Sequence, residues 1–166
     1  YKDYEILDNG PLRFTVKLTF HPQVVKGDST IVETRVITLD TGSYLNRTAV
    51  SYSHVQESLP VVTGIVLHDA DGSVMMDASS GYMTYVDPTT GPGQGKIFMG
   101  AAFPFNVGEV KKVLFSEEER KQRNHAFGHV LAVSDYEPDS EYVYYWGFAW
   151  DQADITTIEG WNEYMK

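Results

Sequence analysis

An aromatic segment near the C-terminus, residues 142–151, constrains the fold of this chain more than any other. Side chains on a β-strand alternate between its two faces. One face of this segment would carry five large aromatic residues, which are Tyr142, Tyr144, Trp146, Phe148 and Trp150. The opposite face carries mostly smaller side chains. Two interpretations stay open: a core strand of a β-sandwich, since aromatic residues dominate core burial, or a flat surface on which sugar rings stack.

Strand patterns recur along the rest of the chain. Apolar and polar residues alternate from Leu12 to His21, which predicts a strand with one buried face and one facing water or a ligand. Val61 to His68 is apolar on both faces and predicts a central strand between two layers. Further strands are predicted at 30–39, 74–76, 81–86, 96–102, 111–115, 126–134 and 141–150. The sequence therefore predicts an all-β fold, an antiparallel β-sandwich, in a single domain spanning 1–166.

Helix is predicted in few places. Thr156 and Glu159 have capping-box spacing, and Ile158, Trp161 and Met165 follow as one apolar stripe. These features predict a short C-terminal helix packed on the edge of the sandwich. The charged run at 116–124 predicts a solvated loop or a single helical turn, or else a mobile flap beside a site.

Composition excludes several classes of function. The 166 residues carry a formal net charge of -10, with 23 acidic against 13 basic residues, which argues against a nucleic-acid partner. The sequence has no run of 18 apolar residues, so it predicts no membrane-spanning helix. The chain has no Cys, which excludes disulfides, thiolate nucleophiles and cysteine-ligated zinc. No nucleotide or cofactor motif occurs.

Three histidines are candidate catalytic or binding residues. His129 lies among apolar residues on a predicted strand, either as a hydrogen-bonded structural residue or as a base whose pKa falls with burial. His68, at the end of a predicted strand, and His125, beside the charged run, are similar candidates. His125 and His129 would lie about 13 Å apart on a strand, too far to share a metal ion, so no metal site is predicted.

The segment 40–47 places Tyr44 and Arg47 directly after a predicted strand. An arginine is well shaped for two-pronged contact with a uronate carboxylate. The alternative is a surface loop with Arg47 in an ion pair. The sequence singles out no carboxylate pair typical of a glycosidase and no serine nucleophile motif.

Several stretches carry a family resemblance. They are Gly10–Arg13, Leu39–Arg47, Thr63–His68 and Tyr144–Trp150. Together they resemble a secreted bacterial family of unknown function, the 4861 type, whose genes lie among those for breakdown of uronate-containing polysaccharides. The resemblance implies a galactose-mutarotase-like supersandwich and a periplasmic or secreted location. It also implies that this chain is the C-terminal portion of a longer protein.

The resemblance implies a carbohydrate-active domain that binds or processes acidic oligosaccharides, as a lyase or epimerase. His68 or His129 would then be the base, Tyr44 a hydroxyl contact or acid, and Arg47 the carboxylate contact. Rings for stacking would come from Trp146, Trp150 and either Tyr82 or Tyr85, and His125 would contact the substrate. The alternatives are a non-catalytic saccharide-binding module and a structural domain that docks on the N-terminal portion of its own protein.

Overall fold

A computed structural model describes residues 1–70, 72–89, 91, 93–105 and 107–166. The chain divides into two compact units, one made of Tyr1–Val61 with Asp135–Trp146, the other of Val62–Ser134 with Gly147–Lys166. Strands β6, β11 and β12 each begin in one unit and end in the other. The expectation of a single domain stays a prediction.

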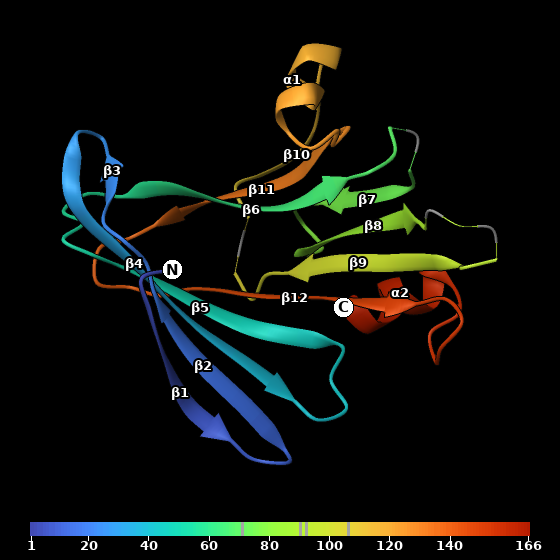
Figure 1. Ribbon diagram of the computed structural model, residues 1–166, viewed down its shortest axis with the longest axis horizontal. Helices are drawn as coiled ribbons and strands as arrows, with labels where there is room; N and C mark the ends of the chain where they lie inside the picture. The colour runs from blue at the N-terminus through green and yellow to red at the C-terminus, as the bar shows by residue number, and fades with distance from the viewer. Residues whose placement is uncertain (71, 90, 92, 106) are drawn as a thin grey trace. The chain divides into compact units, whose positions relative to one another are not determined.

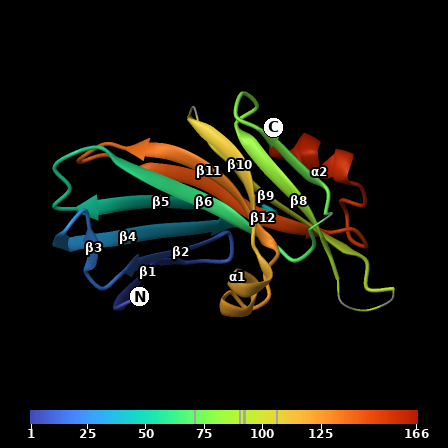
Figure 2. The same ribbon diagram turned by 90° about the horizontal axis from the view of Figure 1, so that it is seen from above.

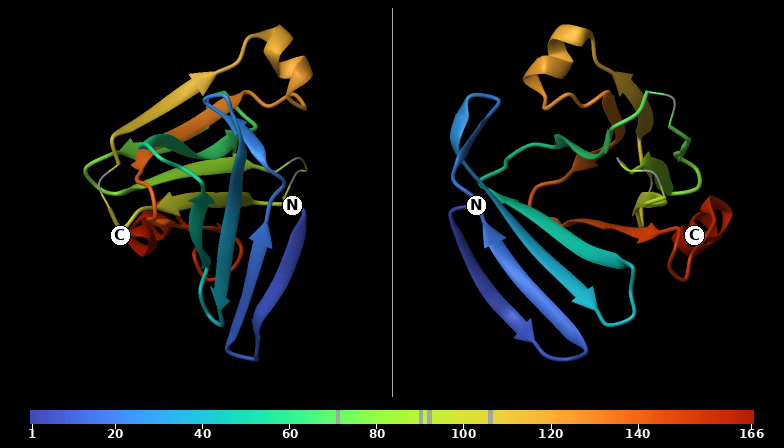
Figure 3. Two further views of the ribbon diagram at one scale, coloured as in Figure 1. Left: turned by 90° about the vertical axis from the view of Figure 1, so that its left-hand side faces the viewer. Right: turned by 45° about the vertical axis from the view of Figure 1, so that its right-hand side comes forward.

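The first unit is built on an antiparallel sheet. Its strands are β1 (Asp3–Asn9), β2 (Arg13–Thr19), β3 (Gln23–Val25), β4 (Asp28–Asp40), β5 (Leu45–Ser53) and the start of β12 (Tyr142–Trp150). Hydrogen-bonded neighbours follow the order β1-β2-β4-β5-β12, and β3 pairs with β4. Figures 1 and 3 show β1, β2, β4 and β5 lying side by side.

The register of this sheet gathers the apolar residues of the predicted 12–21 strand on one face. Val16 lies opposite Ile6 on β1 and opposite Ile37 on β4, and Phe14 lies opposite Leu39. The other face carries threonines and charged residues, because the same register pairs Thr15 with Thr38. The predicted alternation of β2 is therefore confirmed. The predicted burial of its apolar face is wrong, because 39% of Phe14 is exposed, whereas Thr15 on the other face is buried.

The second unit holds two sets of paired strands and both helices (Figure 2). Its elements are β6 (Leu59–Leu67), β7 (Val74–Asp77), β8 (Tyr82–Pro88), β9 (Lys96–Ala102), β10 (Glu109–Leu114), α1 (Glu117–Gln122), β11 (Gly128–Tyr136) and α2 (Ile158–Met165), with the end of β12. Neighbours follow β12-β9-β8-β7 in one set and β10-β11-β6 in the other.

The predicted C-terminal helix is present as α2, and it packs through its apolar stripe. Trp161 is fully buried, and its indole N–H donates to the Met99 carbonyl oxygen at 3.2 Å. The predicted capping box of Thr156 with Glu159 is wrong. Thr157 is the residue with extended backbone before the helix, and its hydroxyl accepts the Gly160 N–H at 3.1 Å.

The structure confirms the predicted all-β fold of antiparallel sheets with a short C-terminal helix. Three strands, β1, β3 and β5, escaped sequence prediction. The central position predicted for 61–68 is wrong, because Val62 and Val66 are exposed on one face of β6. No helix in the described part of the chain is long and apolar enough to span a bilayer.

Candidate functional site

Strand β12 turns most of its aromatic face outward. Tyr142 is buried at the start of the strand, as the core-strand interpretation requires. Further along, 39% of Trp146, 60% of Phe148 and 44% of Trp150 are exposed. Gly147 and Ala149, between them, are buried. The smaller side of the strand therefore faces the core, and the large rings lie at the surface.

Hydrogen bonds hold the two exposed indoles in place. The Nε1–H of Trp146 donates to the hydroxyl of Thr48 at 2.8 Å, and Thr48 is buried. The Nε1–H of Trp150 donates to the carbonyl oxygen of Gln94 at 2.8 Å. Since each ring is tied at its polar edge, its apolar surface has a defined orientation, which lowers the entropy lost on binding.

A buried acid, an arginine and two tyrosines form a cluster in the first unit. The Nε–H of Arg35 donates to the Glu33 carboxylate, and Glu33 is buried. Tyr52 lies opposite Glu33 in the register of β4 and β5. Tyr144 precedes Trp146 by two residues on β12.

The phenols of this cluster act as neutral hydrogen-bonding groups. Burial, reinforced by the negative charge of Glu33, raises the pKa of Tyr52 far above its ordinary value. Burial also raises the pKa of Tyr144. The cluster escaped sequence prediction, although the opposite charges of Glu33 and Arg35, two residues apart on a predicted strand, were a readable signal.

Arg47 lies on the opposite face of the sheet from the side chain of Trp146. Arg47 is opposite Thr38 in the register, on the face of the sheet that carries Thr15. Trp146 reaches Thr48, which lies on the other face because it is the next residue along β5. Tyr44 lies in the turn that precedes β5. The structure therefore does not bring the predicted carboxylate contact to the aromatic surface.

His68 forms a pair with Asp87 in the second unit. Its Nδ1 lies 2.8 Å from Asp87 Oδ2, and 58% of the imidazole side chain is exposed against 15% of the carboxylate. The Tyr85 hydroxyl accepts the backbone N–H groups of His68 and Asp69, both at 3.1 Å, and donates to Asp87 Oδ1 at 3.4 Å. A carboxylate that accepts from Nδ1 fixes the tautomer and leaves Nε2 as the basic nitrogen.

His129 and the charged segment lie together around two aromatic rings. The His129 ring meets Phe115 edge-on with centroids 5.0 Å apart, and burial lowers the pKa of His129. The guanidinium of Arg123 lies 4.6 Å above Phe115, and that of Arg120 lies 3.7 Å above the Phe127 ring. These contacts tie α1 to the strands beside it, which disfavours a mobile flap.

The remaining predicted residues take different places. His125 is exposed in the turn after α1, with its backbone N–H donating to the Arg120 carbonyl oxygen at 2.8 Å. Tyr82 is buried, and its hydroxyl lies 3.8 Å from the Met75 sulfur, so it offers no exposed ring for stacking.

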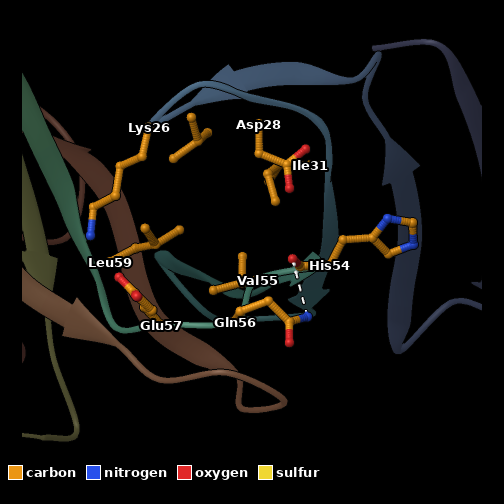
Figure 4. A pocket seen from close by; sticks show the side chains of 9 residues that line it. Lys26, Asp28, Ile31, His54, Val55, Gln56, Glu57 and Leu59 are labelled. Atoms are coloured by element: carbon orange, nitrogen blue, oxygen red, sulfur yellow. Dashed lines mark hydrogen bonds between the residues drawn. The ribbon is translucent and has the colours of Figure 1, made fainter.

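A hollow of about 260 Å³ in the first unit is lined by residues of β3, the start of β4 and the segment 54–59 (Figure 4). Its floor is apolar and consists of the buried residues Ile31, Val55 and Leu59. The polar side chains at its rim are Lys26, Asp28, His54, Gln56 and Glu57. Both signs of charge ring the opening, so the hollow selects no ligand by charge alone. Across the described residues, no group of three or more His, Asp or Glu side chains is arranged to hold a metal ion.

Comparison with known proteins places the chain in a family. The model of a domain of unknown function, DUF4861, matches residues 1–166. The chain belongs to the DUF4861 family. A curated relative, "Uncharacterized protein P7" of Formosa agariphila, is 23% identical over 167 residues, which cover 100% of this chain and 39% of the relative. This DUF4861 chain thus spans less than half the length of that relative. No solved structure matches it.

The DUF4861 chain therefore brings together only some of the predicted site residues. Trp146 and Trp150 are exposed on one strand, and His68 gains a carboxylate partner that sequence reasoning did not name. His129 is partly buried beside α1, Tyr82 is in the core, and Arg47 is on the opposite sheet face from Trp146.

Proposed function

We propose that this chain binds carbohydrate through the outward face of β12, in a secreted or periplasmic protein. The observation that carries the proposal is the exposure of Trp146, Phe148 and Trp150 on a strand whose smaller residues are buried. A folded protein normally places its large aromatic rings in the core, and exposed ones mark interaction surfaces. Each exposed ring offers an apolar face that matches the flat apolar face of a pyranose sugar.

Polar groups near Trp146 suit the hydroxyls of a sugar. Asn46 donates its side-chain amide to the Trp146 carbonyl oxygen at 3.4 Å, which places an amide next to this residue. The neutral phenol of Tyr144 lies two residues before Trp146 on β12. Such groups both donate and accept hydrogen bonds, as recognition of hydroxyl groups requires.

The charges on the first unit's sheet bear on the proposed uronate specificity. Arg13 is held in a two-pronged ion pair with Asp40, at 2.6 and 2.7 Å, and Arg35 is paired with Glu33. The chain also carries a net charge of -10. An acidic glycan would need local cations to overcome this field, so the charge of the sugar is the part of the proposal most in need of a test.

Titration calorimetry with matched oligosaccharides tests the proposal. Oligogalacturonates and neutral galactans of equal length would be titrated into the protein at 50 and 300 mM salt. Binding of either class, lost in Trp146→Ala, supports a saccharide surface, and tighter binding of the uronate at low salt supports acidic specificity. Absence of binding across both series would contradict the proposal.

A second candidate function is proton abstraction by His68. The pairing with Asp87 favours it, because an imidazole held by a buried carboxylate is an orientated general base. In a uronate lyase the base takes the proton alpha to the carboxylate, and the electrons of that C–H bond form a C=C bond to the neighbouring carbon. The C–O bond at that carbon breaks, and the leaving oxygen keeps the bonding pair and takes up a proton. An epimerase would return the proton to the opposite face.

Absorbance of the unsaturated uronate product distinguishes a lyase from a binding module. His68→Ala should abolish product formation, and Asp87→Asn should lower the rate by about 10²–10⁴-fold with little change in KM, since it removes the group that holds the tautomer. His129→Gln is the matched histidine control and should keep full activity. Activity that survives in His68→Ala would remove this residue from the mechanism.

A further inference from the structure

One face of the first unit's sheet is apolar and open. We define the open face as six residues, which are Tyr4, Ile6, Phe14, Val16, Ile37 and Leu39. The register of β1, β2 and β4 places all six on one side of the sheet. Four of them are well exposed, with 59% of Tyr4, 50% of Ile6, 39% of Phe14 and 41% of Leu39 accessible.

The open face is one contiguous apolar patch, because its residues are neighbours across three strands. At roughly 150–250 Å² for a large side chain, these exposed fractions leave on the order of 350 Å² of contiguous apolar surface. In an antiparallel sheet the apolar face normally packs on a core and the polar face meets water. Here the polar face holds the buried Thr15 and the ion pair of Lys17 with Glu5. No layer of the described chain covers the four exposed residues of the open face.

The edge of the same sheet is also uncovered. β1 is the last strand of the sheet order, and all seven of its residues are exposed. A seven-residue edge strand beside an apolar face is a site where further chain adds. Edge and face belong to the same three strands, so one incoming layer can cover both.

We infer that the open face is the docking surface for a β-layer supplied by the remainder of a longer polypeptide that contains this chain. The occupant follows from length: these residues correspond to 39% of a relative that covers them completely, so that relative holds 61% of its chain outside the matched region. Domains bury apolar sheet faces by stacking a second layer on them. The net charge of -10 opposes the other simple occupant, a second copy of the same acidic chain.

Cysteine labelling tests the inference, because the 166 residues contain no Cys. Leu39→Cys reports on the open face, and Lys17→Cys, on the polar face of the same sheet, is the matched control. Maleimide labelling at each position would be followed by mass spectrometry of the tryptic peptide, in the 166-residue chain and in the full polypeptide encoded by its gene. Circular dichroism confirms folding, and Phe14→Cys replaces Leu39→Cys if the latter unfolds.

The expected result is labelling at least 10-fold slower at Leu39→Cys in the full polypeptide than in the short chain, with Lys17→Cys unchanged. Equal rates at Leu39→Cys in both proteins, or a gene that encodes only these residues, would overturn the inference. Protection in the short chain that increases with its concentration would overturn it in favour of a dimer. Protection that appears only with added oligosaccharide would overturn it in favour of a ligand surface. The saccharide proposal concerns β12 and is tested separately, so either can fail alone.

Discussion

Replacement of Trp146 by alanine should weaken saccharide binding by an amount that the structure bounds. A Trp side chain presents up to about 250 Å², so the exposed 39% amounts to roughly 100 Å². At about 25 cal/mol per Å² the ring could contribute up to about 2.5 kcal/mol. Ordering and desolvation costs reduce this to about 1–2 kcal/mol, which is a loss of about 5–30-fold in Kd.

One further variant separates ring area from ring orientation, and a second is a control at another exposed aromatic residue. Trp146→Phe keeps an aromatic face but removes the N–H that donates to Thr48, so we expect a loss of about 2–5-fold. Tyr4→Ala removes an exposed aromatic residue from β1 and should leave the Kd unchanged. Calorimetry with the tightest-binding oligosaccharide measures all three. An unchanged Kd in Trp146→Ala, or an equal loss in Tyr4→Ala, would refute the assignment of the binding surface to β12.

Three other predictions concern stability, each measured by urea unfolding. The lowered pKa of His129 means that the unfolded chain binds a proton more readily than the folded chain, so stability should fall as pH drops below about 6.5. His129→Gln should flatten this fall between pH 7.5 and 5.5. Parallel stability curves for the variant and the original chain would contradict this prediction. Trp161→Ala should cost about 3–5 kcal/mol, since it empties a fully buried site and removes the bond to Met99; a loss below about 1 kcal/mol would show that α2 contributes little. Arg35→Met should cost about 1–3 kcal/mol because it leaves the buried Glu33 carboxylate unpaired; adding Glu33→Gln should recover part of this loss, and strict additivity would argue against the pair.

Local alternation accounts for what the sequence predicted well. β2, β4, β11 and β12 have period-two patterns or β-branched runs, and each was found near its predicted position. β1 was missed because a bulge between Ile6 and Asp8 breaks its alternation. β5 was missed because its Thr, Ala and Ser residues give little hydrophobic contrast, although Thr48, Ala49 and Val50 are buried.

The candidate sites were less predictable because they depend on pairing between distant segments. Nothing near His68 in sequence names Asp87, which lies 19 residues later and reaches it through the end of β8. The outward turn of β12 depends on which side of the strand the rest of the protein covers. Aromatic residues alone suit a core and a surface equally, and the burial of Gly147 and Ala149 decides between them.

The indole resonances of the three tryptophans give the most direct test of the proposed binding surface. In ¹H–¹⁵N spectra, titration with the best oligosaccharide should shift the Nε1–H signals of Trp146 and Trp150 and leave that of the buried Trp161 in place. Saturable shifts at the two β12 indoles would support the account. Saturable binding that leaves both of them unmoved would contradict it.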